Sequence, residues 1–162
     1  MRKLASLILL AVALSVSALT TLSQTSVAEQ LIKAAAPDRN IDWSKTIIRF
    51  DADGDGIEDF TWLGQSKSKV RIGFVHGPLQ AKSKVQLLEF GVGGVSQSDL
   101  CALPATLRLE RLDYTPGSRD IPPLHGFRRS RALRGLVLHG GDCDDIHLYW
   151  NRASHLLAWW RR

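Results

Sequence analysis

Residues Val70-Arg71-Ile72-Gly73-Phe74-Val75-His76 carry apolar side chains at every second position, and Arg71 and Gly73 lie between them. This period of two is typical of a β-strand with one buried face. Similar short runs, each bounded by Gly, Pro, Ser or Asp, occur along the chain from Trp43 onward, and the short links between them favour antiparallel pairing. They cover residues 46–50, 59–63, 84–90, 106–112, 133–138, 145–150 and 155–160. About eight short strands with almost no helix predict an all-β fold, an antiparallel β-sandwich, with an incomplete propeller-like arrangement as the alternative.

Between the first two of these runs the chain carries an acidic, glycine-containing segment, Asp51-Ala52-Asp53-Gly54-Asp55-Gly56-Ile57-Glu58-Asp59. Its first three aspartates alternate, so their carboxylates would point inward, and the two glycines permit a tight turn. Calcium takes about six to eight oxygen ligands, which such a loop can supply from carboxylates and a main-chain carbonyl. An acidic turn that binds nothing is the alternative. We predict a Ca²⁺ site, because four aspartates this close in the sequence would repel each other without a cation.

The pattern Asp-x-Asp-x-Asp-Gly-x-x-Asp of this segment resembles the strand-loop-strand calcium sites of integrin-like FG-GAP repeats. An EF-hand is excluded, because its twelfth position, a bidentate glutamate, is Trp62 here and the flanks are predicted strands. The resemblance implies a structural clamp between two strands, not a catalytic metal. The ligands that it implies are the side chains of Asp51, Asp53, Asp55 and Asp59 and the carbonyl of Ile57.

The start of the chain has the three-part pattern of a cleavable secretory signal. Arg2 and Lys3 precede an apolar run over residues 4–14, and a small-polar tract ends at Ser26-Val27-Ala28. The apolar run is short for a membrane span of about 20 residues, so a retained anchor is the less favoured alternative. The predicted organisation is a signal peptide over 1–28, an N-terminal arm over 29–42 and a calcium-binding β domain over 43–162. We expect a periplasmic or secreted protein that is not membrane-embedded.

The chain has two cysteines, Cys101 and Cys143, and both follow the predicted signal. An oxidising compartment favours a disulfide between them, and two separate buried thiols are the alternative. The formal net charge is +5, with a basic cluster over residues 128–131 that either faces an anionic partner or is simply solvated. Nucleic acid is not an expected partner of an exported protein.

The sequence gives no local support for catalysis. The five histidines have no zinc-site spacing, and no Gly-x-Ser-x-Gly nucleophile turn accompanies them. Asp142, Asp144 and Asp145 form a second acidic group, but it lacks the alternation of the calcium loop and is interpreted as a turn. Two carboxylates of a glycosidase pair cannot be placed together from sequence. The protein is therefore predicted not to be an enzyme.

Candidate partner-binding residues lie near the C-terminus. In the predicted hairpin of residues 146–150 and 156–160, one face must be core, and the other, with Tyr149, Trp159 and Arg161, has the composition of binding hot spots. A proline- and glycine-rich segment over 113–130 adds Tyr114 and His125. Two alternatives remain open, namely that the hairpin face packs under this segment and that the segment has no role.

A small exported β domain with one calcium loop and a Trp-rich final strand resembles bacterial periplasmic lysozyme inhibitors and immunity proteins against secreted cell-wall-degrading effectors. The resemblance implies a non-enzymatic module whose partner is a secreted muramidase-type protein. One exposed loop would enter the muramidase cleft, either the 113–130 segment or residues 91–98. The alternative is a carbohydrate- or peptidoglycan-binding module, which would expose coplanar aromatic rings on one sheet to bind a glycan.

Overall fold

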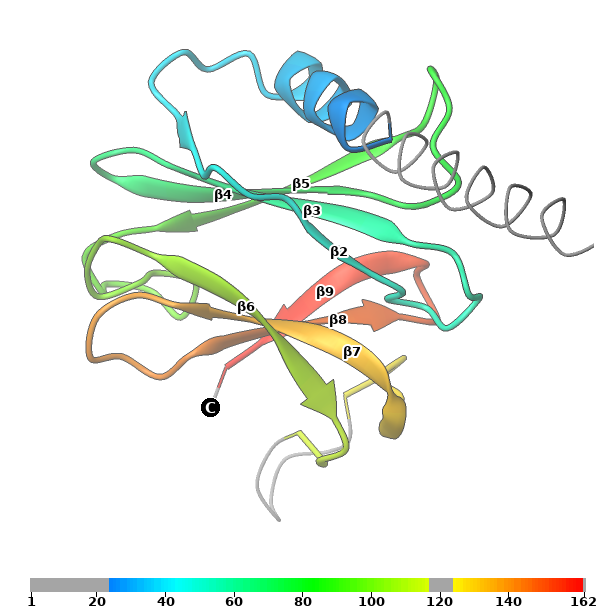
Figure 1. The fold of residues 1–162 in the computed structure, drawn as a ribbon. Coiled ribbons are helices and arrows are strands. Elements are labelled where there is room, and N and C mark those ends of the chain that lie inside the picture. Colours follow the sequence, from blue (N-terminus) through cyan, green and yellow to red (C-terminus); the bar gives the residue numbers. More distant parts are fainter. Residues whose placement is uncertain (1–23, 117–123, 162) are drawn as a thin grey trace, which may run out of the picture.

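The computed structural model describes residues 24–116 and 124–161, in which two antiparallel sheets stack face to face (Figure 1). The first sheet contains β1 (Asp42–Trp43), β2 (Ile48–Phe50), β3 (Asp59–Gln65), β4 (Lys69–Val75) and β5 (Val85–Gly91). The second sheet contains β6 (Thr106–Leu112), β7 (Ser130–His139), β8 (Ile146–Asn151) and β9 (Leu156–Trp160). Strands that follow one another from β3 to β5 and from β6 to β9 are neighbours, so each sheet is largely a meander. The predicted antiparallel β-sandwich is confirmed, and β1 adds a short strand to the expected ones.

The main hydrophobic core lies between the two sheets. Val70, Ile72 and Phe74 of β4 are at most 2% exposed and face Leu136 and Leu148 from the second sheet. The alternation read from β4 therefore identifies core residues correctly. Burying such aliphatic side chains contributes about 1.5–3 kcal/mol each.

A helix over residues 24–35 covers the outer face of the first sheet (Figure 1). Its Ala28 and Ile32 are fully buried, in a cluster that includes Phe60 of β3. Gly73 of β4 provides the space, because a Cβ at this position would overlap Ile32 Cγ2. The expectation of one buried face for β4 is thus wrong, since the helix buries the second face as well.

This helix spans the predicted boundary between signal peptide and arm at residues 28 and 29. Residues 1–23 of the predicted signal lie outside the described residues. Within the described ranges, no helix is long and apolar enough to cross a membrane.

The disulfide predicted between Cys101 and Cys143 is present, with a Cα–Cα distance of 5.6 Å. It joins the β5–β6 connection to the β7–β8 turn. The Gly140 carbonyl accepts hydrogen bonds from the Cys101 and Ala102 amides at 3.0 and 3.2 Å, which ties the same two segments together. The bridge therefore fixes one end of the sandwich.

Candidate metal centre

The acidic loop between β2 and β3 holds its carboxylates against its own backbone. Gly54 and Gly56 have φ angles of 86° and 85°, which favour glycine, and allow the chain to turn tightly around Asp51. Asp51 Oδ1 accepts a hydrogen bond from the Gly54 amide at 2.7 Å, and Asp51 Oδ2 accepts one from the Gly56 amide at 2.9 Å. Asp53 Oδ1 accepts the Asp55 amide at 2.9 Å. Asp55 Oδ1 accepts a hydrogen bond from the Ile57 amide at 2.7 Å, so three alternating aspartates are fixed in one turn, as the sequence predicts.

Asp59 closes the loop at the start of β3 and is 1% exposed. Its Oδ2 accepts the Ala52 amide and its Oδ1 accepts the Gly77 amide, each at 2.9 Å. Burial raises the pKa of Asp59 to about 6, even though these two bonds favour the ionised form. Ionised Asp59 is therefore a buried negative charge that a cation would stabilise.

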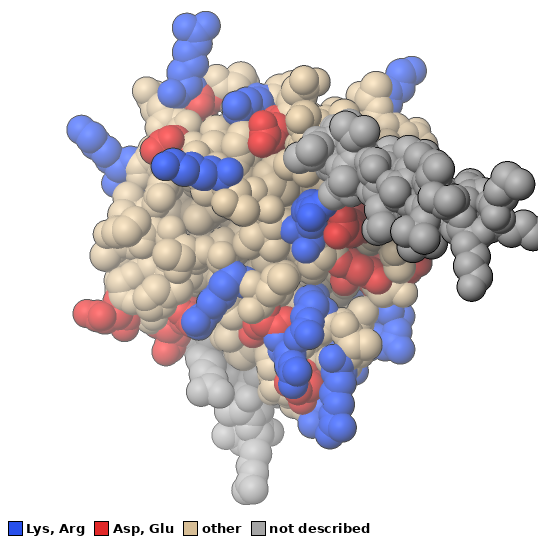
Figure 2. Space-filling view, in the orientation of Figure 1, with Lys and Arg blue, Asp and Glu red and all other residues tan. Residues whose placement is uncertain are grey.

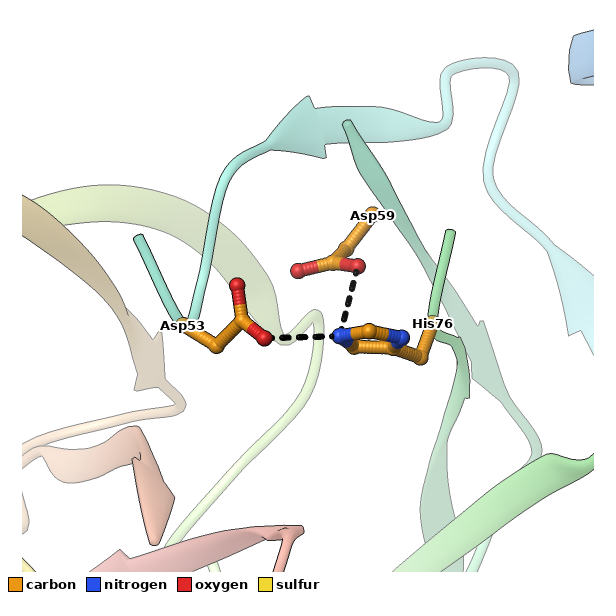
Figure 3. A group of neighbouring side chains, drawn as sticks. All are labelled: Asp53, Asp59 and His76. Carbon is orange, nitrogen blue, oxygen red and sulfur yellow. Dashed lines mark hydrogen bonds and ion pairs between the residues drawn. The ribbon is translucent and has the colours of Figure 1, made fainter. Parts of the chain in front are cut away.

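His76, directly after β4, lies against the loop, a contact that sequence analysis did not predict. Its Nε2 is 3.0 Å from Asp53 Oδ2 and 3.8 Å from Asp59 Oδ1, and Figure 3 shows the ring edge pointing toward both carboxylates. Burial would lower the pKa of His76, but the hydrogen bond to Asp53 and the charge of Asp59 outweigh it and raise the pKa. For Asp53, burial would raise the pKa, but the bonds to His76 and the Asp55 amide lower it.

Within residues 24–116 and 124–161, the acidic and histidine side chains form two groups that could hold a metal ion. One group is Asp51, Asp53 and Asp55, and the other is Asp53, Asp59 and His76. Within each group the potential ligand atoms lie within 4.8 Å of one another. The predicted calcium ligands are thus divided, with Asp53 shared between the groups. Ile57, the predicted carbonyl ligand, follows Asp55 in the loop and is 39% exposed.

The loop also contacts the second sheet. Arg152, in the turn between β8 and β9, donates from Nη2 to the Asp53 carbonyl at 2.9 Å. The His76 ring stacks on Trp150 of β8, with centroids 5.0 Å apart and planes inclined by 27°. Since these contacts cross between the sheets, the loop links the two layers of the sandwich in addition to joining β2 and β3.

In the absence of a bound cation, the free energy of unfolding should fall as the pH rises from about 4 to about 7. Folded Asp59 keeps its proton up to about pH 6, whereas an unfolded aspartate releases it near 3.8. His76 acts in the same direction, because its favoured protonated form is lost as the pH rises through its raised pKa. Thermal unfolding in chelator at pH 5, 6 and 7 measures the trend. Asp59→Asn should reduce the slope, and a wild-type stability that rises over this range would contradict the assignment.

Tyr114 belongs to a polar and aromatic cluster on the outer face of the second sheet. Its hydroxyl donates to Glu110 Oε1 at 2.8 Å, and His147 Nδ1 lies 3.0 Å from Glu110 Oε2. The His147 ring stacks on Trp160, with centroids 4.5 Å apart. These side chains line a cavity of about 460 Å³ together with Thr115, Asp144 and Asp145. Tyr114 is a candidate from the sequence, whereas Glu110 and His147 are not, because these two residues come together only through the pairing of the strands.

The β8–β9 hairpin separates two residues that were predicted to share a face. Asn151 pairs with Leu156, which places Tyr149 opposite Ala158 on the outer face and Trp159 on the inner face. The proposed common face of Tyr149 and Trp159 is therefore wrong. Tyr149 is 5% exposed and its ring lies 5.1 Å from that of Phe127, whereas Trp159 is 36% exposed.

The described part of the 113–130 segment packs on this outer face. Phe127 covers Tyr149, and the His125 carbonyl accepts a hydrogen bond from Asn151 Nδ2 at 3.0 Å, while His125 itself is exposed. Tyr149 therefore packs under the 113–130 segment, which was one of the alternatives for this face of the hairpin. Residues 117–123 of the segment lie outside the described residues.

Residues 92–99 form a loop that is exposed over residues 93–97 and whose backbone is held by Asp99. The Oδ2 atom of Asp99 accepts the Val95 amide at 3.1 Å and the Ser96 amide at 2.9 Å. Val95, at the tip, is 93% exposed. An aliphatic side chain is thus displayed to solvent on a turn whose backbone is fixed from inside.

Arg161, after β9, supports the same loop. Its Nη1 donates to the Asp99 carbonyl at 2.7 Å and to the Gln97 carbonyl at 3.1 Å. Trp159 is two residues earlier, and its ring meets Phe90 at the end of β5, with centroids 5.9 Å apart. Two predicted partner-binding residues, Trp159 and Arg161, therefore lie next to the 92–99 loop.

Comparison of the chain with protein-family models, with curated proteins and with solved structures finds no match. The functional assignment therefore depends on the geometry described above.

Proposed function

We propose that the protein is an exported, calcium-binding β-sandwich that acts without catalysis by binding another protein, a secreted muramidase-type hydrolase, which it inhibits. The observation that carries the proposal is the 92–99 loop, which displays Val95 at 93% exposure on a braced backbone. An exposed loop of this kind can enter a concave partner surface, and an enzyme cleft is such a surface.

The braced loop favours binding because little conformational entropy remains to be lost on association. Asp99 and Arg161 hold its backbone from two sides. Residues 90–98 carry no charged side chain, so recognition would rely on shape, apolar contact and neutral hydrogen bonds. On the face of the molecule drawn in Figure 2, Lys and Arg side chains are interspersed with Asp and Glu, which also argues for recognition that is not led by charge.

Calcium has a stabilising role in this proposal. Asp51, Asp53 and Asp55 offer carboxylate oxygens within one turn, and calcium accepts oxygen ligands in flexible arrangements. The contact from Arg152 to the same turn would transmit the stabilisation to the second sheet. The Cys101–Cys143 disulfide supports export, since such bridges persist in oxidising compartments.

The carbohydrate-binding alternative receives less support from the aromatic side chains. It requires several exposed, coplanar rings on one sheet. All five Trp and both Tyr residues of the chain are within the described ranges, and among them only Trp159 reaches 36% exposure. A single ring at this position does not form a platform for a sugar chain.

Val95→Asp should weaken binding to the muramidase partner by at least about 100-fold, because it places a charge where an apolar contact forms. The fold should be unaffected, since a side chain this exposed contributes little to stability. Binding and lytic activity would be measured with a panel of purified lysozyme-type muramidases, with calcium present. Leu109→Asp is the matched control, because Leu109 is 45% exposed on β6, outside the loop, and binding should persist.

The outcomes separate the alternatives. If the wild-type protein neither binds nor inhibits any muramidase of the panel, the proposed function is refuted. Retention of the wild-type protein on purified peptidoglycan without enzyme binding would favour the carbohydrate-binding module. Equal binding by wild type and Val95→Asp would remove the loop from the interface.

A further inference from the structure

Asp53, Asp59 and His76 converge from three parts of the chain, namely the acidic loop, the first residue of β3 and the residue after β4 (Figure 3). Their facing atoms are one nitrogen and two oxygens, with His76 Nε2 3.0 Å from Asp53 Oδ2 and 3.8 Å from Asp59 Oδ1. The second group, Asp51, Asp53 and Asp55, offers oxygens only. The two groups therefore differ in the ions that they suit.

An imidazole nitrogen is a ligand for first-row transition metals, whereas calcium sites in proteins use oxygen. Zinc binds nitrogen and carboxylate oxygen at about 2.0–2.2 Å. Neighbouring ligand atoms at that distance are about 3.0 Å apart in octahedral and about 3.4 Å apart in tetrahedral geometry. The observed 3.0 and 3.8 Å from His76 Nε2 to the two carboxylates are close to these separations, and all three ligand atoms lie within 4.8 Å of one another.

We propose that Asp53, Asp59 and His76 bind a divalent first-row transition metal, represented by zinc, at a position separate from the calcium position. The inference deepens the proposed function by assigning a second class of ion to the same loop. It rests on that function in one respect only, namely that Asp53 serves as a ligand in both the calcium position and the transition-metal position. Three protein ligands leave coordination positions open for water.

The surroundings hold the three ligands in place before any ion binds. Both carboxylate oxygens of Asp59 are fixed by backbone amides, from Ala52 and Gly77. The His76 ring is fixed by stacking on Trp150. Such outer contacts orient metal ligands and maintain affinity. The His76 side chain is 37% exposed, so an ion can reach the site from solvent.

Isothermal titration of the metal-stripped full chain with zinc and, separately, with calcium tests the proposal. The wild-type protein should bind one zinc ion, and His76→Gln should weaken zinc binding by at least about 10–100-fold while leaving calcium binding in place. Asp51→Asn should show the reverse, with calcium binding lost and zinc binding kept. His139→Gln is the control for adventitious zinc, because His139 is a half-exposed histidine whose Nδ1 lies 2.7 Å from another carboxylate, that of Asp145, at the end of β7.

Zinc affinity of His76→Gln within about two-fold of wild type would overturn the proposal, as would the absence of zinc binding by wild type. Equal losses in His139→Gln and His76→Gln would also overturn it, since they would indicate adventitious binding. The calcium titrations are read separately. If Asp51→Asn and wild type bind no calcium but zinc binding depends on His76, the calcium role fails and the transition-metal site stands. Circular dichroism of each variant shows that it has folded.

Discussion

Replacing Cys101 and Cys143 together by alanine should lower the free energy of unfolding by about 4 kcal/mol. The disulfide closes a loop with a sequence separation of 42 residues, and the entropy that this removes from the unfolded chain corresponds to about that value in the chain-entropy model. A domain of this size has a total stability of only about 5–15 kcal/mol, so the loss is large. Urea unfolding of the variant and of the oxidised wild type measures the difference.

The wild-type protein with its disulfide reduced is the control, and it should unfold at nearly the same urea concentration as the double variant. The loss should extend to partner binding, because the bridge anchors the β5–β6 connection that contains the 92–99 loop. A double variant as stable as the oxidised wild type would mean that hydrogen bonds from Cys101 and Ala102 to Gly140 suffice to hold this end of the sandwich.

The strands were predictable because alternation is a local signal, and the disulfide was predictable because two cysteines allow a single pairing. The alternation of Val70, Ile72 and Phe74 identifies the core face of β4 without knowledge of any other strand. With two cysteines in the chain, one pairing exists, and only its formation was in question. The turn around Asp51 was equally accessible, since its aspartates and glycines are adjacent in the sequence.

The position of His76 could be found only with the register of the β3–β4 hairpin. Phe60 pairs with Val75, so the next residues outward, Asp59 and His76, lie opposite each other. A search for metal-binding histidine spacings cannot detect this neighbourhood, because Asp59 and His76 are 17 residues apart in the sequence and come together only when β3 pairs with β4. The prediction that Tyr149 and Trp159 share a face of the β8–β9 hairpin was wrong for the same reason. Assigning these two residues to faces requires knowledge that Asn151 pairs with Leu156.

The start of the helix over residues 24–35 was hidden by a different effect, because small residues near a predicted cleavage site also satisfy a signal pattern. Ala28 serves both interpretations, as the last residue of the predicted signal and as a fully buried helix residue. Gly73 on β4 gives the complementary evidence, but a glycine in a strand does not say which side chain will fill the space above it.

The pair formed by Ile32 and Gly73 should show strong coupling. Ile32→Ala should lower the free energy of unfolding by about 2–4 kcal/mol, because a fully buried side chain leaves a cavity. Gly73→Ala should cost about 1–3 kcal/mol, because its methyl group would overlap Ile32 Cγ2. In the double variant the new methyl group enters the vacated space, so the combined loss should be smaller than the sum of the two single losses.

Urea unfolding of the four proteins gives this coupling, and Gln30→Ala, on the exposed face of the same helix, is the control with an expected change below about 0.5 kcal/mol. Additive losses, or a neutral Ile32→Ala, would mean that the helix does not rest on β4 in solution.

A coupled result has a consequence for processing. Cleavage after Ala28 would then remove the first part of a stabilising helix and one of its two fully buried side chains, so the native N-terminus, measured by mass spectrometry, should lie before residue 28.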